Sequence, residues 1–245
     1  MGRSFYGLRT RLRPHWHRVL ERSPRLYTYN LRKRQPRTPA VTADADLVLV
    51  GYPACANTFA RIAFLHANPG LHVASHAHSW TQVAEAARHR LPTIILVRDP
   101  VEAVTSVLVR FPERNVHQEL VAFARLYRRS ARYLDRVVVA DFEEVTTVFG
   151  EVIERVNRRF GTSFNPFVHG DESAIAEVLG QIEAYDRTQF GEATNMRTAR
   201  PSAEKEDEKA RIRPILASPE LQPLVEDCER VYRCLRQRAG LSASG

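Results

Sequence analysis

The fold is decided by the stretch Asp46-Leu-Val-Leu-Val-Gly-Tyr-Pro-Ala-Cys-Ala-Asn-Thr-Phe-Ala-Arg-Ile-Ala-Phe64. Its apolar run, from Leu47 to Val50, is short and sharply bounded, as in a buried strand. Gly51 and the small residues after it then break the strand, and helical spacing begins at Thr58. A strand, a tight turn and a helix N-terminus direct several backbone N–H groups at one point, which attracts phosphate or sulfate. The stretch therefore predicts an anion-binding turn.

A second junction of this kind occurs in the stretch Pro92-Thr-Ile-Ile-Leu-Val-Arg-Asp-Pro-Val-Glu-Ala-Val-Thr-Ser106. Its buried strand ends at Arg98, and Pro100 suits the first turn of the helix that follows. Ser106 lies on that helix, eight residues after Arg98. A guanidinium and a hydroxyl group can bind a phosphate together, so this junction predicts a second anion site.

The two stretches together resemble the PAPS-dependent sulfotransferases (PAPS is 3′-phosphoadenosine 5′-phosphosulfate). In that family a loop reading roughly Tyr-Pro-Lys-Ser-Gly-Asn/Thr-Thr-Trp/Phe cradles the 5′-phosphosulfate, and an Arg-Asx-Pro segment with a later serine binds the 3′-phosphate. The matching stretches here are Tyr52-Pro-Ala-Cys-Ala-Asn-Thr-Phe59 and Arg98-Asp-Pro with Ser106. The resemblance is to a bacterial-type member with a divergent loop, and it covers roughly residues 46–240. It implies transfer of a sulfuryl group from PAPS to a hydroxyl or amine of a small-molecule or carbohydrate acceptor, with adenosine 3′,5′-bisphosphate as product.

The resemblance also implies a general base and a set of donor-binding residues. His76 matches the histidine of a Lys-Thr-His segment in the family, and an imidazole suits removal of the acceptor's proton. No metal is implied, because activation of the donor is electrostatic. The implied donor-binding residues are Ala54, Cys55, Ala56, Asn57, Thr58, Phe59, Arg98, Ser106, Arg200 and Lys205.

Each of several of these residues has an alternative role that is structural and involves no ligand. In that alternative, Arg98 forms a surface ion pair with Asp99 or Glu102. Thr58 would cap the helix, which is compatible with donor binding. His76 would only pack or donate hydrogen bonds.

The polar segment 196–205 falls where the family closes a basic loop over the 3′-phosphate. It lacks the Arg-Lys-Gly pattern common in the eukaryotic cytosolic members, so Arg197, Arg200 and Lys205 are assigned by position alone. A solvated helix entry with Ser202 as N-cap fits these residues equally well.

One departure from the family concerns activity directly, because Ala54 stands where the family loop has a lysine. That cation would stabilise the charge on the departing bridging oxygen. Another cation such as Arg61 could substitute, catalysis could run slowly on backbone amides, or the domain could bind nucleotide without chemistry. Ala56 replaces the family's glycine, which restricts the loop if this position needs a positive φ. Cys55, near a helix N-terminus, could have a lowered pKa or simply fill space.

Two other enzyme classes share some of these sequence features. On a strand, His72, His76 and His78 would face one side, which is compatible with a metal-dependent hydrolase, although no nearby carboxylate or cysteine completes a ligand set. A Walker A motif would need glycine and lysine where this chain has Ala56 and Asn57. An ATP-driven enzyme is therefore not expected.

From Asp46 onward, strands alternate with helices, which predicts an α/β three-layer sandwich. Its central parallel sheet carries the P-loop-like phosphate-binding turn, and ligands are expected at the carboxyl ends of the strands. The variable segments 66–92 and 161–195 are expected to form the acceptor pocket. The strands are expected near 47–51, 71–76, 93–97 and 136–140. The helices are expected near 58–67, 79–89, 101–110, 115–134, 146–160, 171–187, 202–216 and 219–238.

The net charge of +8 is concentrated at the N-terminus of this chain of 245 residues. Residues 1–37 hold eleven lysines and arginines against one acid, and the remainder is close to neutral. This predicts a basic arm and linker over 1–45, followed by a single sulfotransferase-like α/β domain with a helical C-terminal part over 46–245. The spacing of apolar residues over 5–20 is helical, so the arm would pack on the body or contact an anionic membrane surface or a partner protein.

The remaining composition favours a cytoplasmic protein, with peripheral membrane contact through residues 1–37 as an alternative. The three cysteines have no disulfide or metal spacing, no secretory h-region is present, and no apolar run approaches the length of a membrane span. Nucleic acid is not an expected partner, because basic and aromatic residues are not interleaved. The alternative function is a non-catalytic, sulfotransferase-like nucleotide- or ligand-binding protein that docks through the basic arm.

Overall fold

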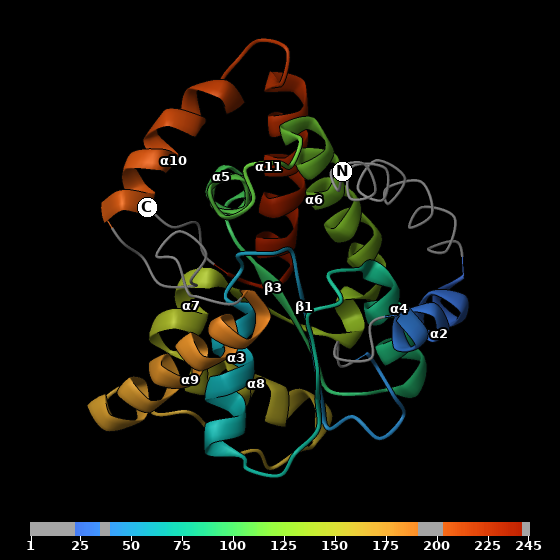
Figure 1. Ribbon diagram of the computed structural model, residues 1–245. Helices are drawn as coiled ribbons and strands as arrows, with labels where there is room; N and C mark the ends of the chain where they lie inside the picture. Colours follow the sequence, from blue (N-terminus) through green and yellow to red (C-terminus); the bar gives the residue numbers. More distant parts are fainter. Residues whose placement is uncertain (1–22, 35–39, 191–202, 242–245) are drawn as a thin grey trace, which may run out of the picture.

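A computed structural model of the chain describes residues 23–34, 40–190 and 203–241. At its centre is a sheet in the order β2-β1-β3-β4, and every neighbouring pair of strands is parallel. Figure 1 shows β1 and β3 running side by side through the middle of the molecule. The strands are β1 (Leu47–Gly51), β2 (Val73–Ala74), β3 (Thr93–Val97) and β4 (Val138–Asp141).

The two central strands are the apolar runs that the sequence indicates. Every residue of β1 and β3 is buried, as expected for parallel strands that are covered on both faces. Their register pairs Val48 with Thr93 and Gly51 with Leu96. Both strands therefore end at the same edge of the sheet, and this edge brings the turn after β1 beside Arg98.

Helices cover both faces of the sheet, as right-handed crossovers require. Figure 1 shows α3, α8 and α9 on one side of the sheet and α4 and α6 on the other. The first layer comprises α3 (Asn57–Ala67), α7 (Phe142–Thr147), α8 (Phe149–Phe160) and α9 (Glu172–Phe190). The second comprises α4 (Trp80–His89), α6 (Val116–Ser130) with the 3-10 helix η1 (Ala131–Arg136), and α11 (Gln222–Arg238). The predicted α/β class with a central parallel sheet is confirmed.

Two further helices extend beyond the carboxyl edge of the sheet. α5 (Pro100–Arg110) follows β3 directly, and α10 (Ala203–Leu216) packs against it. The start of α5 follows from its sequence, because the side chain of Asp99 accepts a hydrogen bond from the Glu102 N–H at 3.0 Å and Pro100 occupies the first turn. This cap fixes the direction in which α5 leaves Arg98.

The strand predicted over 71–76 is wrong in length, because β2 contains only Val73 and Ala74. His76 and His78 have φ values of +63° and +44°, in the left-handed region that L residues rarely adopt. The alternation of a strand cannot continue through such residues. The histidines are therefore placed by a loop.

Two predicted helices also differ in their bounds. The helix expected over 115–134 ends at Ser130 and continues as η1, and the helix expected over 146–160 is two helices, α7 and α8. Asp141 forms a capping box with Glu144 and so starts α7 directly after β4, and the break lies at Val148, whose φ of −140° and ψ of 38° are not helical.

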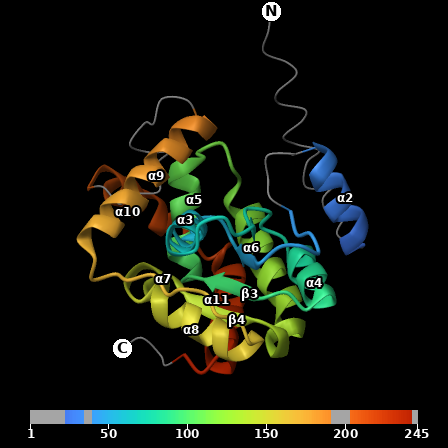
Figure 2. The ribbon, with the colours of Figure 1, turned by 90° about the horizontal axis from the view of Figure 1, so that it is seen from below.

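The described part of the N-terminal arm packs on the body. Figure 2 shows α2 (Pro24–Arg34) beside α4. The Gln82 side chain of α4 donates a hydrogen bond to the Thr28 hydroxyl at 3.0 Å and accepts one from the Val41 N–H at 2.9 Å. The amphipathic helix predicted over 5–20 lies outside the described residues. None of the helices described by the structure has the length and apolar character needed to cross a bilayer.

Candidate functional site

The turn after β1 is held in place by the hydroxyl group of Tyr127, on α6. This hydroxyl donates a hydrogen bond to the carbonyl oxygen of Leu96 at 2.6 Å and accepts one from the Tyr52 N–H at 3.0 Å. Gly51 leaves no room for a side chain, because a Cβ atom there would lie 2.8 Å from the Leu96 oxygen. The turn is therefore fixed against the end of β3.

Two alanines of the turn adopt backbone conformations typical of glycine. Ala54 has φ of 65° and Ala56 has φ of 60°, and a left-handed L residue costs about 1–2 kcal/mol. Ala56 precedes α3 as its N-cap and forms no side-chain hydrogen bond to the helix. The first N–H groups of α3 therefore have no side-chain cap, which leaves them suited to an anion. The alternative that Thr58 caps this helix is wrong.

The side chains of Cys55 and Asn57 stabilise the turn from within. Cys55 is fully buried, and its Sγ lies 3.4 Å from the Tyr127 hydroxyl. Burial raises the pKa of the Cys55 thiol to about 12, so the alternative of a reactive thiolate is wrong. The amide of Asn57 donates a hydrogen bond to the Tyr52 carbonyl oxygen at 2.9 Å. Only the backbone of these two residues remains for a ligand.

Arg98 and Ser106 lie together, as their spacing predicts. The Arg98 guanidinium is 3.4 Å from the Ser106 hydroxyl and also donates a hydrogen bond to the Ala54 carbonyl oxygen at 3.0 Å. One face of the guanidinium covers the Phe142 ring, 4.0 Å from its centroid. The two motifs thus meet at one side chain.

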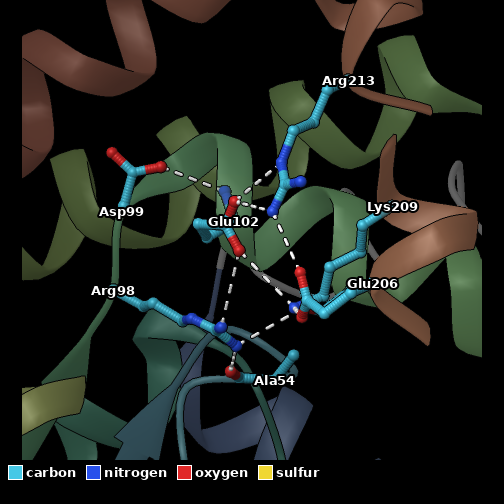
Figure 3. A network of polar contacts seen from close by, with 8 residues as sticks. Ala54, Arg98, Asp99, Glu102, Glu206, Lys209 and Arg213 are labelled. Carbon is cyan, nitrogen blue, oxygen red and sulfur yellow. Dashed lines mark hydrogen bonds and ion pairs between the residues drawn. The ribbon is translucent and has the colours of Figure 1, made fainter. Parts of the chain in front are cut away.

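Glu102 lies at the centre of a network of cations beside Arg98, which Figure 3 shows. Its carboxylate is 3.8 Å from Arg98, 3.5 Å from Lys209 and 2.7 Å from Arg213. Glu206 also pairs with Lys209 and Arg213. Three cations thus share two carboxylates. Of the two ion-pair alternatives for Arg98, the pair with Glu102 forms, whereas Asp99 caps α5.

Lys209 and Arg213 were missed by the sequence reasoning. They lie on α10 at positions four and eight residues after Lys205, so all three share one helix face. This spacing of four residues is the feature of the sequence that could have identified them. Arg197 and Arg200 lie outside the described residues.

Lys205 is buried, so it does not sit at a solvated helix entry. Burial, together with the charges of Arg110 and Lys209, lowers the pKa of Lys205 to about 8, while Asp186 acts in the opposite direction. Asp186 is buried and pairs with Arg110 at 2.7 Å. Arg110, Asp186 and Lys205 thus link α5, α9 and α10.

His76 lies beside Thr58 rather than on a strand. Its Nε2 is 3.3 Å from the Thr58 hydroxyl, and its Nδ1 is 2.7 Å from the Ser75 hydroxyl. The ring stacks at a tilt against Tyr185, with centroids 5.4 Å apart. Burial lowers the pKa of His76 to about 3, with further contributions from the charges of His78, Arg61 and Arg110. The imidazole is therefore neutral at neutral pH.

The other two histidines have separate partners. Nδ1 of His78 donates a hydrogen bond to the Gly51 carbonyl oxygen at 2.7 Å, and His72 lies 3.8 Å from the carboxylate of Asp44. The common strand face behind the metal alternative does not exist. Within the described residues, no group of three or more His, Cys, Asp or Glu is arranged to hold a metal ion.

Phe59 joins the turn to an aromatic cluster. Its ring centroid lies 6.1 Å from that of Phe167, edge to face, and 5.8 Å from that of His169. A partly buried aromatic cluster thus lies directly after the turn.

No family model and no curated protein matches the chain. Among solved structures, the chain is similar to mouse sulfotransferase SULT7A1 complexed with PAP. The match has 12% sequence identity and a TM-score of 0.46, and it covers 81% of this chain and 90% of that chain.

Proposed function

We propose that this protein is a sulfotransferase that moves a sulfuryl group from PAPS to a hydroxyl or amine of a small-molecule or carbohydrate acceptor. The observation that carries the proposal is the position of Arg98, which contacts both Ala54 in the turn and Ser106 on α5. A donor with anionic groups at its 5′ and 3′ positions matches two anion sites that adjoin in this way. The ends of β1 and β3 supply these sites at the edge where parallel sheets bind ligands.

The proposal assigns the donor's two anionic groups to different residues. The backbone of 54–59 and the Thr58 hydroxyl would hold the 5′-phosphosulfate, and Arg98 with Ser106 would hold the 3′-phosphate. Lys209 on α10 is a further cation within reach, because it shares Glu102 with Arg98. A phosphate would then replace the carboxylate as their partner.

The transfer needs one base and one leaving group. The acceptor oxygen or nitrogen would attack sulfur while the bond from sulfur to the bridging oxygen breaks, and the electron pair would leave with adenosine 3′,5′-bisphosphate. The acceptor's proton would pass to Nε2 of His76, which faces the Thr58 hydroxyl. In place of the family's lysine, the uncapped backbone N–H groups at the start of α3 would stabilise the departing charge.

Calorimetric titration of the full chain with adenosine 3′,5′-bisphosphate, beside adenosine 5′-phosphate, tests the donor site. We expect the bisphosphate to bind at least about tenfold more tightly, and Arg98→Ala to remove that preference. Arg158→Ala, at an exposed arginine of α8, is the matched control. Equal binding of the two nucleotides would overturn the proposal. Bisphosphate binding without turnover of PAPS by any acceptor would favour the alternative of a non-catalytic binding protein.

A further inference from the structure

Arg61 is a cation that the proposed donor site leaves unused. It lies on α3 one turn after Thr58, so both side chains share a helix face. Its Nε is buried without a hydrogen-bond partner, and no carboxylate of the described residues forms an ion pair with it. A buried N–H without an acceptor is costly, because Nε has lost its contact with water and no protein group has replaced it.

The charge of Arg61 acts on the place where the acceptor would react. It is among the causes that lower the pKa of His76, and it opposes the burial that raises the pKa of Tyr185. These two rings lie 5.4 Å apart, and Thr58 contacts the same imidazole. Arg61 stands one turn after Thr58 on the same face of α3, and Thr58 lies 3.3 Å from the imidazole, so Arg61 lies close to the base.

The charges around His76 leave an excess of positive charge. His78 is itself neutral at neutral pH, because burial lowers its pKa to about 4, so the charges that act on His76 there are those of Arg61 and Arg110. The carboxylate of Asp186 is paired with Arg110 at 2.7 Å, so it offsets that guanidinium first. An anionic group of a ligand would neutralise the positive charge that remains on Arg61.

We propose that Arg61 binds an anionic group of the acceptor, a carboxylate, sulfate or phosphate, next to the hydroxyl or amine that reacts. The inference rests on the proposed function, because it takes His76 as the base. A guanidinium binds such groups with two parallel hydrogen bonds, which would also orient the acceptor. The acceptor class is then anionic rather than neutral.

This arrangement would couple binding to chemistry. An imidazole with a pKa of about 3 is a weak base at neutral pH. An anion on Arg61 offsets one of the charges that depress this pKa, so the pKa rises when the acceptor is bound. The other groups that face His76 are His78, Arg110, Thr58, Ser75 and Tyr185.

The test uses the full chain saturated with adenosine 3′,5′-bisphosphate and titrated with sulfate, phosphate and acetate, with acetamide as the uncharged control. We expect saturable binding of at least one anion, a higher NMR-measured pKa of His76 when it is bound, and loss of both effects in Arg61→Met. Arg61→Lys should keep part of the binding. Arg158→Met, on an exposed surface of α8, should change neither.

The outcomes separate this inference from the proposed function. If the bisphosphate binds but no anion binds through Arg61, the inference is overturned and the donor site stands. If Arg61→Met weakens the bisphosphate itself, Arg61 belongs to the donor and the inference is also overturned. If the bisphosphate does not bind at all, the proposed function fails, and an acceptor role for Arg61 fails with it.

Discussion

The guanidinium of Arg98 lies 3.0 Å from the carbonyl oxygen of Ala54, the residue that stands where the sulfotransferase loop has a lysine. A cation from the residue after β3 therefore contacts the backbone of the turn at this position. The same guanidinium is 3.8 Å from Glu102, which offsets part of that charge. The site thus lacks the cation that a lysine at position 54 would supply, and the charge of the nearby Arg98 is already partly neutralised by Glu102.

Restoring the lysine tests whether the turn limits catalysis. We expect Ala54→Lys to raise the single-turnover rate of PAPS by about a hundredfold, because a cation aimed at the leaving oxygen is worth about 2.7–4 kcal/mol in comparable sites. Ala54→Met controls for side-chain size. Equal rates in the two variants would show that the absent charge is not what limits the reaction.

Backbone strain at Ala56 predicts a gain in stability. With φ at 60°, Ala56→Gly should raise the free energy of unfolding by about 0.5–1 kcal/mol, since glycine adopts this conformation without steric cost. The same change at Ala60, inside α3, should lower it by about 1 kcal/mol. Urea denaturation of both variants measures the difference, and a loss of stability in Ala56→Gly would contradict the strain.

The carboxylate of Glu102 competes with a ligand phosphate for the same cations. Glu102→Gln removes its charge, so we expect adenosine 3′,5′-bisphosphate to bind about three- to tenfold more tightly in calorimetry. Glu154→Gln, at an exposed ion pair of α8, should leave the affinity unchanged. Weaker binding in Glu102→Gln would mean that the carboxylate positions the cations rather than blocking them.

The half-buried His78 predicts a loss of stability in acid. Burial lowers the pKa of His78 to about 4, against a model-compound value near 6.5, so the unfolded chain takes up a proton before the folded protein does. Stability is therefore lost as the pH falls from about 6.5 to about 4, by up to about 2 kcal/mol for a partly exposed side chain. Urea denaturation at pH 7.5 and 4.5 should show a smaller loss in His78→Gln. His117→Gln, an exposed change on α6, should behave as the wild type. Equal losses in wild type and His78→Gln would contradict the prediction.

Much of the fold could be predicted from local patterns. The apolar runs at 47–51 and 93–97 match β1 and β3 residue for residue, because burial on both faces permits no polar interruption. The proximity of Arg98 and Ser106 followed from a strand end and two turns of helix. These relationships depend on residues that lie close together in the sequence.

The remainder of the site depends on contacts between distant segments. No local pattern predicts a left-handed histidine, and His78 adopts that conformation while bonded to Gly51, 27 residues earlier. Lys209 and Arg213 stand among six other acidic or basic residues on a polar helix, so their common face had no apolar pattern to define it. Only the packing of α10 on α5 directs that face at Glu102.

The hydroxyl of Tyr127 has a consequence for any attempt to transplant or redesign this turn. One phenol on α6 ties together the end of β1, the end of β3 and the thiol of Cys55. A tilt of α6 would therefore be transmitted to the turn as a displacement of its first peptide group. Grafting residues 51–59 onto another α/β scaffold without a matching tyrosine would leave a buried N–H and a buried carbonyl without partners, and the grafted turn would not keep its shape.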